Sequence, residues 1–360
     1  MNSSAPGNAE RQQLAARFAG GPHVSASSNA EQILGDWLSE LEPEQSAALD
    51  ALLAHPFAKT ILTGIAEFSP YLFDLVRADA ARLIRVLKCD PEPHLAALIE
   101  NTTRDVFAAP GETDVMHLLR RMKAEAALMI ALCDIGGVWP VMRVTSALTD
   151  LAVASVQAAL RFLLRQEVAR GRMTAANHDR PEDGSGLIVL AMGKMGAGEL
   201  NYSSDIDLIV FFDPQATSLV ADIEPAPFFV RVTQALARLL QQRSGDGYVF
   251  RVDLRLRPDP ASTQVAMSIE AALHYYEREG RTWERAAMIK ARPCAGDPKA
   301  GDALVAEIAP FVWRKHLDFA ALADVHDMKR RMQTFRGQSE ISVEGHNVKV
   351  GRGEDRKSVV

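Results

Sequence analysis

Two aspartates stand two positions apart where a polar stretch of the chain meets an apolar one. Asp205 and Asp207 follow Ser203-Ser204 and lead into the apolar run at residues 208–212. On a strand, positions i and i+2 point to the same face, so both carboxylates would project together. Acids at the mouth of a buried strand are costly without a partner, and hard oxygen ligands suit Mg²⁺. The pair therefore predicts a magnesium site, in preference to two solvated acids at a strand end.

A glycine-rich turn precedes the acid pair. It reads GKMGAG at residues 193–198 and follows an apolar run of strand length. Its GxxGxG spacing is neither a Walker A loop nor the GxGxxG of dinucleotide-binding folds. Glycine lets the backbone approach a phosphate closely, and backbone N–H groups can donate to its oxygens. A tight turn without a ligand is the alternative. The residues that we predict to bind phosphate or nucleotide here are Gly193, Lys194, Gly196, Gly198 and Ser204.

A third acid lies in the alternating segment RVDLRLRP at residues 251–258. If this segment is a strand, Arg251, Asp253, Arg255 and Arg257 share one face. That face is either an exposed edge or the polar floor of an active site, and the nearby motifs favour the floor. Asp253 would then complete a catalytic triad of carboxylates, and the arginines would neutralise phosphate or the carboxylates, with Arg255 and Arg257 expected to bind phosphate.

Strands and helices must hold these motifs in place. Apolar or β-branched runs predict strands at residues 187–191 and 206–212, on either side of the glycine turn. The alternation at residues 248–256 predicts a third strand. Helical periodicity follows the acid pair at residues 228–243, 269–279, 298–312 and 319–335.

Helical spacing also dominates the part of the chain before the strands. Prolines break it into short helices, apart from one long, mostly buried helix expected at residues 145–165. We therefore expect an α+β fold, mostly helical, with one mixed-sheet domain flanked by helical regions. The expected parts are a flexible tail at 1–30, a helical domain at 31–170, the catalytic domain at 171–300 and the start of a trailing helical region at 301–350.

Composition narrows the class of protein. The net charge of −6 supplies no basic field, so we expect no nucleic-acid partner. Cys89, Cys133 and Cys294 form no CxxC pair, which argues against disulfides and zinc and fits a reducing cytoplasm. We expect these cysteines to be small buried hydrophobes. We expect neither a signal peptide nor a membrane span, because charges interrupt the most apolar region, residues 126–164.

The motifs together resemble the polymerase-beta-like nucleotidyltransferase superfamily. The resemblance rests on the sequence GKMGAGELNYSSDIDLI and on the segment RVDLRLRP that follows it. With WER at 283–285, KARP at 290–293 and DMKRRM at 327–332, residues 30–353 resemble more narrowly the family of bifunctional glutamine synthetase adenylyltransferase/adenylyl-removing enzymes. The short DxD pattern alone would indicate only the superfamily.

The resemblance implies a specific reaction. Enzymes of this family carry two nucleotidyltransferase halves, and the wording ELNxSSDIDL resembles the first, adenylyl-removing half. Its implied activity is phosphorolysis, in which inorganic phosphate attacks the AMP on a tyrosine of adenylylated glutamine synthetase and releases ADP. The resemblance also implies Mg²⁺ at Asp205, Asp207 and Asp253, a PII-type nitrogen signal protein as partner, ATP and ADP as nucleotides, and a cytoplasmic location.

The resemblance ends before the chain does. After NVKVGRG at residues 347–353 the family pattern is not continued, so we expect residues 354–360 to be a non-native tail on a truncated sequence. Two alternatives stay open. One is a uridylyltransferase of the PII-type protein, which would be expected to carry a histidine–aspartate hydrolase domain. The other is a catalytically inactive module that binds glutamine synthetase or PII, against which the retention of all three acids argues.

Overall fold

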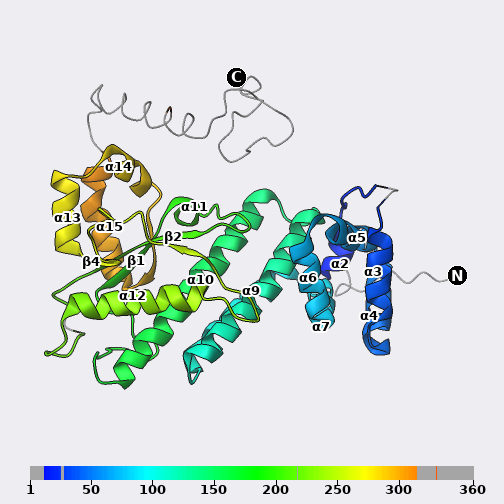
Figure 1. Cartoon of the computed structure of the whole chain (residues 1–360), viewed down its shortest axis with the longest axis horizontal. Coiled ribbons are helices and arrows are strands. Elements are labelled where there is room, and N and C mark those ends of the chain that lie inside the picture. Colours follow the sequence, from blue (N-terminus) through cyan, green and yellow to red (C-terminus); the bar gives the residue numbers. More distant parts are fainter. Residues whose placement is uncertain (1–11, 26–27, 217, 314–329, 331–360) are drawn as a thin grey trace.

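Helices fill the first part of the chain in the computed structural model, which describes residues 12–25, 28–216, 218–313 and residue 330. Proline occupies the first turn of three of these helices, where its missing N–H costs nothing. Figure 1 shows the short helices at one end of the molecule, the sheet at the other, and two long helices between them. The helices are α2 (Leu14–Arg17), α3 (Ala30–Ser39), α4 (Pro43–Leu53), α5 (Ala58–Phe68), α6 (Pro70–Ala78), α7 (Ala80–Lys88), α8 (Pro91–Ala108), α9 (Glu112–Ile135) and α10 (Val141–Ala169).

The prediction of a flexible tail up to residue 30 is wrong for the segment around α2. Leu14 and Phe18 are buried in the main core, and Arg17 pairs with Asp90 and Glu92 at 3.0 and 2.8 Å. The Ser-, Ala- and Gly-rich composition suggested a tail, but two apolar side chains suffice to anchor this short helix. Residues 1–11 lie outside the described residues.

The long helix α10 confirms the prediction at residues 145–165 and extends it at both ends. By length and composition alone α10 could cross a membrane, but 78% of its most apolar 18-residue window is buried inside the fold. It packs against α8 and α9 on one side and against α12 (Pro225–Gln241) and the sheet on the other. It is therefore a core helix shared by both parts of the molecule.

The sheet is mixed, and its central strands were predicted to the residue. The strands β1 (Leu187–Ala191) and β2 (Ile206–Phe212) pair antiparallel, and β5 (Arg292–Gly296) pairs antiparallel with the other edge of β1. Two short strands, β3 (Val252–Asp253) and β4 (Ala266–Ser268), both pair parallel with β2. This sheet and the preceding helices confirm the α+β fold. The strands β4 and β5 were not predicted.

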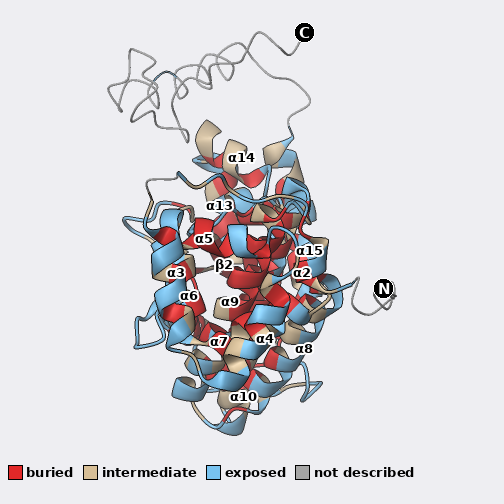
Figure 2. Ribbon diagram, turned by 90° about the vertical axis from the view of Figure 1, so that its right-hand side faces the viewer, coloured by how far each residue is buried: buried red, intermediate tan, exposed pale blue. Residues whose placement is uncertain are grey.

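Helices cover both faces of β1 and β2, which explains why these strands read as continuous apolar runs. Val189 and Val210 face the core that contains α10 and α12. Ile188 and Ile209 face a smaller core, formed with α13 (Ile269–Arg278), α14 (Thr282–Met288) and α15 (Pro298–Val312). Figure 2 shows buried residues in the interior and exposed residues on the outer faces of the helices. The helices α12, α13 and α15 confirm three predicted segments, whereas residues 319–335, apart from residue 330, lie outside the described residues.

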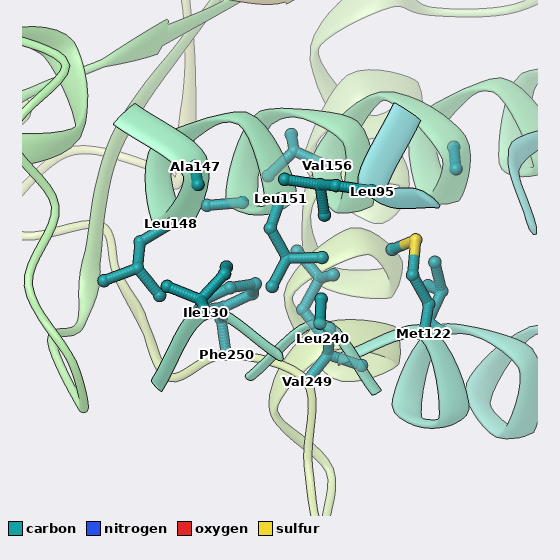
Figure 3. Packing of buried hydrophobic residues seen from close by; sticks show 14 of the residues in the cluster. Leu95, Met122, Ile130, Ala147, Leu148, Leu151, Val156, Leu240, Val249 and Phe250 are labelled. Carbon is teal, nitrogen blue, oxygen red and sulfur yellow. The ribbon is translucent and has the colours of Figure 1, made fainter. Parts of the chain in front are cut away.

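One apolar core joins the N-terminal helices to the sheet region. In Figure 3, Leu95, Met122 and Leu151 from α8, α9 and α10 pack with Leu240 of α12 and Phe250 of the following loop. The expected boundary at residue 170 therefore separates two sequence patterns but not two separate cores. The helical region forms part of the support for the loops that lead to the acids.

An ion network ties α7, α8 and α9 together inside the helical region. Glu125 accepts a hydrogen bond from Arg85 at 2.6 Å, and its other oxygen lies 2.8 Å from Nε2 of His94. Burial acts to raise the pKa of Glu125, but the hydrogen bonds from His94 and Arg85 outweigh it and hold the pKa near 2. Glu125 is therefore an ionised, paired group, and its charge contributes to the stability of the bundle.

The cysteines match the expectation of small buried hydrophobes. Cys133 and Cys294 are buried, Cys89 is half-buried, and all three are free thiols. Burial raises the pKa of Cys89 and of Cys294 to about 12. These thiols are therefore protonated near neutral pH, which argues against nucleophilic or metal-binding roles.

Candidate active site

Pairing of two strands brings the predicted acids together. The strands β2 and β3 run parallel, and Asp207 lies directly opposite Asp253. Neighbouring strands are about 4.8 Å apart, and side chains at paired positions share a face. Asp205 lies two positions before Asp207 and therefore belongs to the same face. The structure thus places all three acids at one end of the β2–β3 pair.

The glycine turn leads from β1 to the same place. The N–H of Met192 donates to the carbonyl of Asp207 at 2.9 Å, and the short helix α11 (Gly193–Gly196) follows. Gly193 has a φ of +54°, and a Cβ on it would lie 2.9 Å from Oδ2 of Asp207. Glycine at this position therefore lets the start of α11 lie against this carboxylate without displacing it.

The other predicted residues of the turn serve different purposes. A Cβ on Gly196 would lie 1.9 Å from the carbonyl oxygen of Lys290, so this glycine lets α11 pack against the backbone before β5. Gly198 has a φ of +77° with open space around it, which fits a turn. With the amide of Asn201 oriented to satisfy its neighbours, Nζ of Lys194 donates to the Asn201 side-chain oxygen at 2.9 Å. Gly193 is thus the glycine that touches the acids.

Arginines neutralise two of the three acids. Nε of Arg251 donates to Asp205, and its other nitrogens donate to the hydroxyl of Tyr248 at 2.8 Å and to the carbonyl of Ser203 at 2.6 Å. Tyr248 was not among the predicted site residues, and its place in an alternating segment gave no signal for this role. Arg251 therefore links the loop before β2 to the chain before β3.

Arg255 holds Asp253 in a fork. Its Nε lies 3.0 Å from both carboxylate oxygens, its Nη2 donates to Oδ2 at 2.5 Å, and its backbone N–H donates to Oδ1 at 2.8 Å. The hydrogen bonds from Arg255 lower the pKa of Asp253. The side chain of Arg255 is 83% exposed, so this partner can turn into solvent or toward a ligand.

The predicted strand at residues 248–256 is wrong except for β3, and Arg257 does not join the acids. The backbone bond from Arg255 to Asp253 turns the chain immediately after β3. Arg257 instead donates to the carbonyls of Leu254, Pro260 and Thr263 at 2.7, 2.9 and 3.1 Å. Its guanidinium holds a loop, which leaves no support for its predicted phosphate contact.

Two of the three acids, Asp205 and Asp253, line an open hollow of about 550 Å³, whereas Asp207 is not among its lining residues. Asp205, Asp253, Arg243, Tyr248, Arg251 and Arg255 are among its lining residues. Ser204, which precedes Asp205, lines a separate cavity behind this loop. The hollow is large enough for a nucleotide-sized ligand and is open to a macromolecular substrate.

The three acids suit a hard divalent cation after a small rearrangement. Within the described ranges, no group of three His, Cys, Asp or Glu side chains is already gathered around one point. Asp205 and Asp253 are turned toward Arg251 and Arg255, whose side chains are 47% and 83% exposed, and ion pairs with exposed arginines are weak. The strand register keeps the carboxylates on one face, and carboxylate oxygens are ligands that Mg²⁺ accepts.

Comparison with known proteins places the chain in a family. The family model for glutamate-ammonia ligase adenylyltransferase matches residues 60–306. The chain is 76% identical over 355 residues to a bifunctional glutamine synthetase adenylyltransferase/adenylyl-removing enzyme of Bradyrhizobium diazoefficiens, covering 98% of this chain and 36% of that relative. A relative with the same name from Rhodopseudomonas palustris strain BisB5 is 67% identical over 98% of this chain and 36% of its own length. Another from Xanthobacter autotrophicus is 54% identical over 97% of this chain and 35% of its own length.

The chain thus spans about 36% of the length of these curated relatives. The matched residues include the glycine turn, all five strands and the three acids. The chain belongs to the glutamate-ammonia ligase adenylyltransferase family.

Proposed function

We propose that this chain belongs to the adenylyl-removing half of a bifunctional enzyme, which removes AMP from an adenylylated tyrosine of glutamine synthetase by phosphorolysis. The observation that carries the proposal is the register of Asp207 opposite Asp253, with Gly193 against the Asp207 carboxylate. Acids beside a glycine turn suit transfer of a nucleotidyl group between oxygen atoms. The sequence ELNYSSDIDL at residues 199–208 favours assignment to the first, adenylyl-removing half of the family enzyme.

In the proposed reaction an oxygen of inorganic phosphate attacks the phosphorus of the adenylyl group. The bond from that phosphorus to the tyrosyl oxygen breaks, ADP leaves, and the tyrosyl oxygen takes a proton from solvent. Mg²⁺ held by Asp205, Asp207 and Asp253 would offset the negative charge on the phosphates and on the departing tyrosyl oxygen. A tyrosyl group, with a pKa of about 10, needs no strong general acid to leave.

The remaining residues of the site orient the phosphates. The first N–H groups of α11 have no partner within that helix and lie beside Asp207, where an attacking phosphate can accept from them. Arg255 is exposed and can exchange Asp253 for a phosphate oxygen once a cation neutralises the acid. Lys194 adds a positive charge on the same turn.

The proposal extends to partners and location. The named relatives are glutamine synthetase adenylyltransferase/adenylyl-removing enzymes, which supports glutamine synthetase as the substrate. We include a PII-type signal protein as regulator and a cytoplasmic location. No observation favours the alternative of a uridylyltransferase, and the presence of all three acids argues against an inactive binding module.

Separation of the two activities tests the assignment to the adenylyl-removing half. Asp207→Asn is introduced into the full-length bifunctional enzyme of which we propose this chain to be a part, and two reactions are followed with Mg²⁺. One is phosphate-dependent ADP release from adenylylated glutamine synthetase, and the other is AMP transfer from ATP to the unmodified synthetase. We expect ADP release to fall by ~10²- to 10³-fold, as when the charge stabilisation of a transition state is removed, and AMP transfer to persist. Loss of AMP transfer with retained ADP release would assign the chain to the opposite half.

A further inference from the structure

A second, more enclosed cavity of about 650 Å³ lies behind the loop that carries the acids. Helices α6, α9 and α10 form one wall, and residues 200–204 and 246–250 form the other. Of its lining residues it shares only Tyr248 with the open hollow described above. Its surface is mostly apolar, and its volume is typical of small-molecule sites. Apolar lining residues include Leu72, Leu75, Ala127, Leu148, Leu151 and Phe250.

Two cations in this apolar cavity have few hydrogen-bond partners. Nζ of Lys123 lies 4.5 and 5.0 Å from the ring centroids of Tyr248 and Phe250, and its hydrogen bond to the Tyr248 carbonyl is a long 3.4 Å contact. Burial and then the charge of Arg251 lower the pKa of Lys123 to about 8. Lys123 is half-buried, and a cation removed from water among apolar side chains is costly unless an anion is present.

Arg120 adds the second cation. It is only 4% exposed, and one of its terminal nitrogens donates to the carbonyl of Gln242 at 2.5 Å. Its Nε is buried and has no hydrogen-bond partner in the part of the chain that the structure describes. A buried nitrogen without a partner calls for an explanation, and a hydrogen-bond acceptor on a ligand would supply one.

The acids that also line the cavity already have partners. Asp134 accepts from the hydroxyl of Tyr202 at 3.1 Å, and Oδ2 of Asp246 lies 2.9 Å from Nδ1 of His117. Neither acid makes an ion pair with Lys123 among the contacts of the described residues. The positive charge of Lys123 is therefore available to a ligand.

We propose that this cavity is a second ligand site, for a small organic anion with an apolar body, beyond the AMP-removing site proposed above. The apolar walls take the body of the ligand, and Lys123 and Arg120 take its acidic group. The apolar walls and the unmet hydrogen-bonding capacity of Lys123 and of Nε of Arg120 carry this assignment.

The cavity is linked to the acids by a short series of contacts. Lys123 lies over the ring of Tyr248, the Tyr248 hydroxyl accepts from Arg251 at 2.8 Å, and Arg251 donates to Asp205. Ser203, whose carbonyl also accepts from Arg251, lines the cavity. An anion that draws Lys123 away from Tyr248 changes the surroundings of Arg251, and through it the freedom of Asp205 to hold a cation.

The test uses 8-anilinonaphthalene-1-sulfonate, an aromatic anion that fluoresces in apolar sites, titrated onto the whole protein. N-phenyl-1-naphthylamine, which has a similar apolar body without the sulfonate, measures the apolar part alone. Lys123→Met removes the charge and keeps an apolar stem, and Lys59→Met is the matched control on an exposed lysine of α5. Ala124→Phe fills the cavity from α9 without touching a proposed catalytic group.

We expect saturable binding of the anion that Lys123→Met weakens at least ~10-fold, the usual scale for loss of a charged partner in an apolar site. Lys59→Met should bind as wild type does, and the neutral probe should bind Lys123→Met and wild type alike. Ala124→Phe should weaken both probes. Equal anion binding by wild type, Lys123→Met and Ala124→Phe, with melting curves that show all three folded, would overturn the proposal. None of these readouts depends on AMP removal.

Discussion

Replacing Gly193 with alanine isolates the contact between the glycine turn and the acids. Alanine at a φ of +54° costs about 1–2 kcal/mol, because its Cβ crowds the following carbonyl in the left-handed region. The new Cβ would also lie 2.9 Å from Oδ2 of Asp207, whereas ordinary contact begins at 3.4 Å. The carboxylate must therefore withdraw by roughly 0.5 Å, and misplacements near 1 Å at a reacting centre can cost ~10²-fold in rate.

Gly171→Ala is the matched control. Gly171 has a φ of +67°, a Cβ added to it would meet nothing within 4 Å, and it lies after α10 rather than at the acids. Both variants should lose about 1–2 kcal/mol of unfolding free energy in urea. Only Gly193→Ala should lose ADP release, by roughly ten- to a hundredfold at saturating phosphate and Mg²⁺. Equal activity of the two variants would refute the contribution of this contact to the reaction.

Three further variants test the supports of the site and of the fold. Gly196→Ala drives a Cβ into backbone carbonyl oxygens that cannot rotate away, so we expect at least ~3 kcal/mol of destabilisation or failure to fold, measured by urea unfolding. Arg255→Gln should raise the pKa of Asp253 toward its ordinary value in a carboxyl NMR titration, while the urea unfolding curve should move little because the Arg255 side chain is exposed. Glu125→Gln should cost about 2–3 kcal/mol at pH 7. Because the folded pKa of Glu125 is lowered from 4.5 to about 2, its contribution is present above pH 4.5 and is lost as the pH falls toward 2, so variant and wild type should converge in urea unfolding at low pH.

Local patterns predicted the centre of the sheet well. The strands β1 and β2 were predicted to the residue because both are buried on two faces and bounded by glycine or polar residues. The helix α10 was predicted at residues 145–165 because it is also largely buried and therefore mostly apolar, although its ends extend past the predicted range. Strands and helices whose side chains contact the core along their whole length can thus be predicted from the pattern of apolar residues alone.

The edges of the sheet could not be read in this way. The alternation around Asp253 suggested a long strand. The backbone N–H of Arg255 instead donates a hydrogen bond to the Asp253 carboxylate, and this turn ends β3 after two residues. Arg257 consequently turns to backbone carbonyls instead of the acids. The strand β5 begins Arg292-Pro293 and pairs with β1 across a long stretch of sequence, so no local pattern marked it.

The acidic residues of the candidate site could be predicted from the sequence, but the residues that they pair with or accept hydrogen bonds from could not. Two-residue spacing placed Asp205 and Asp207 on one face, whereas the register with Asp253 depends on long-range pairing that a single sequence does not encode locally. The roles of Tyr248 and Arg251 depend on the same pairing.

The most direct test of AMP removal by phosphorolysis follows the phosphate. Adenylylated glutamine synthetase is incubated with the whole protein, Mg²⁺ and ³²P-labelled inorganic phosphate, using wild type, Asp207→Asn and Asp253→Asn. We predict label in the β-phosphate of ADP with wild type and a loss of ~10²- to 10³-fold in both variants. Release of unlabelled AMP by wild type, or labelled ADP formed equally by all three proteins, would contradict the proposed reaction.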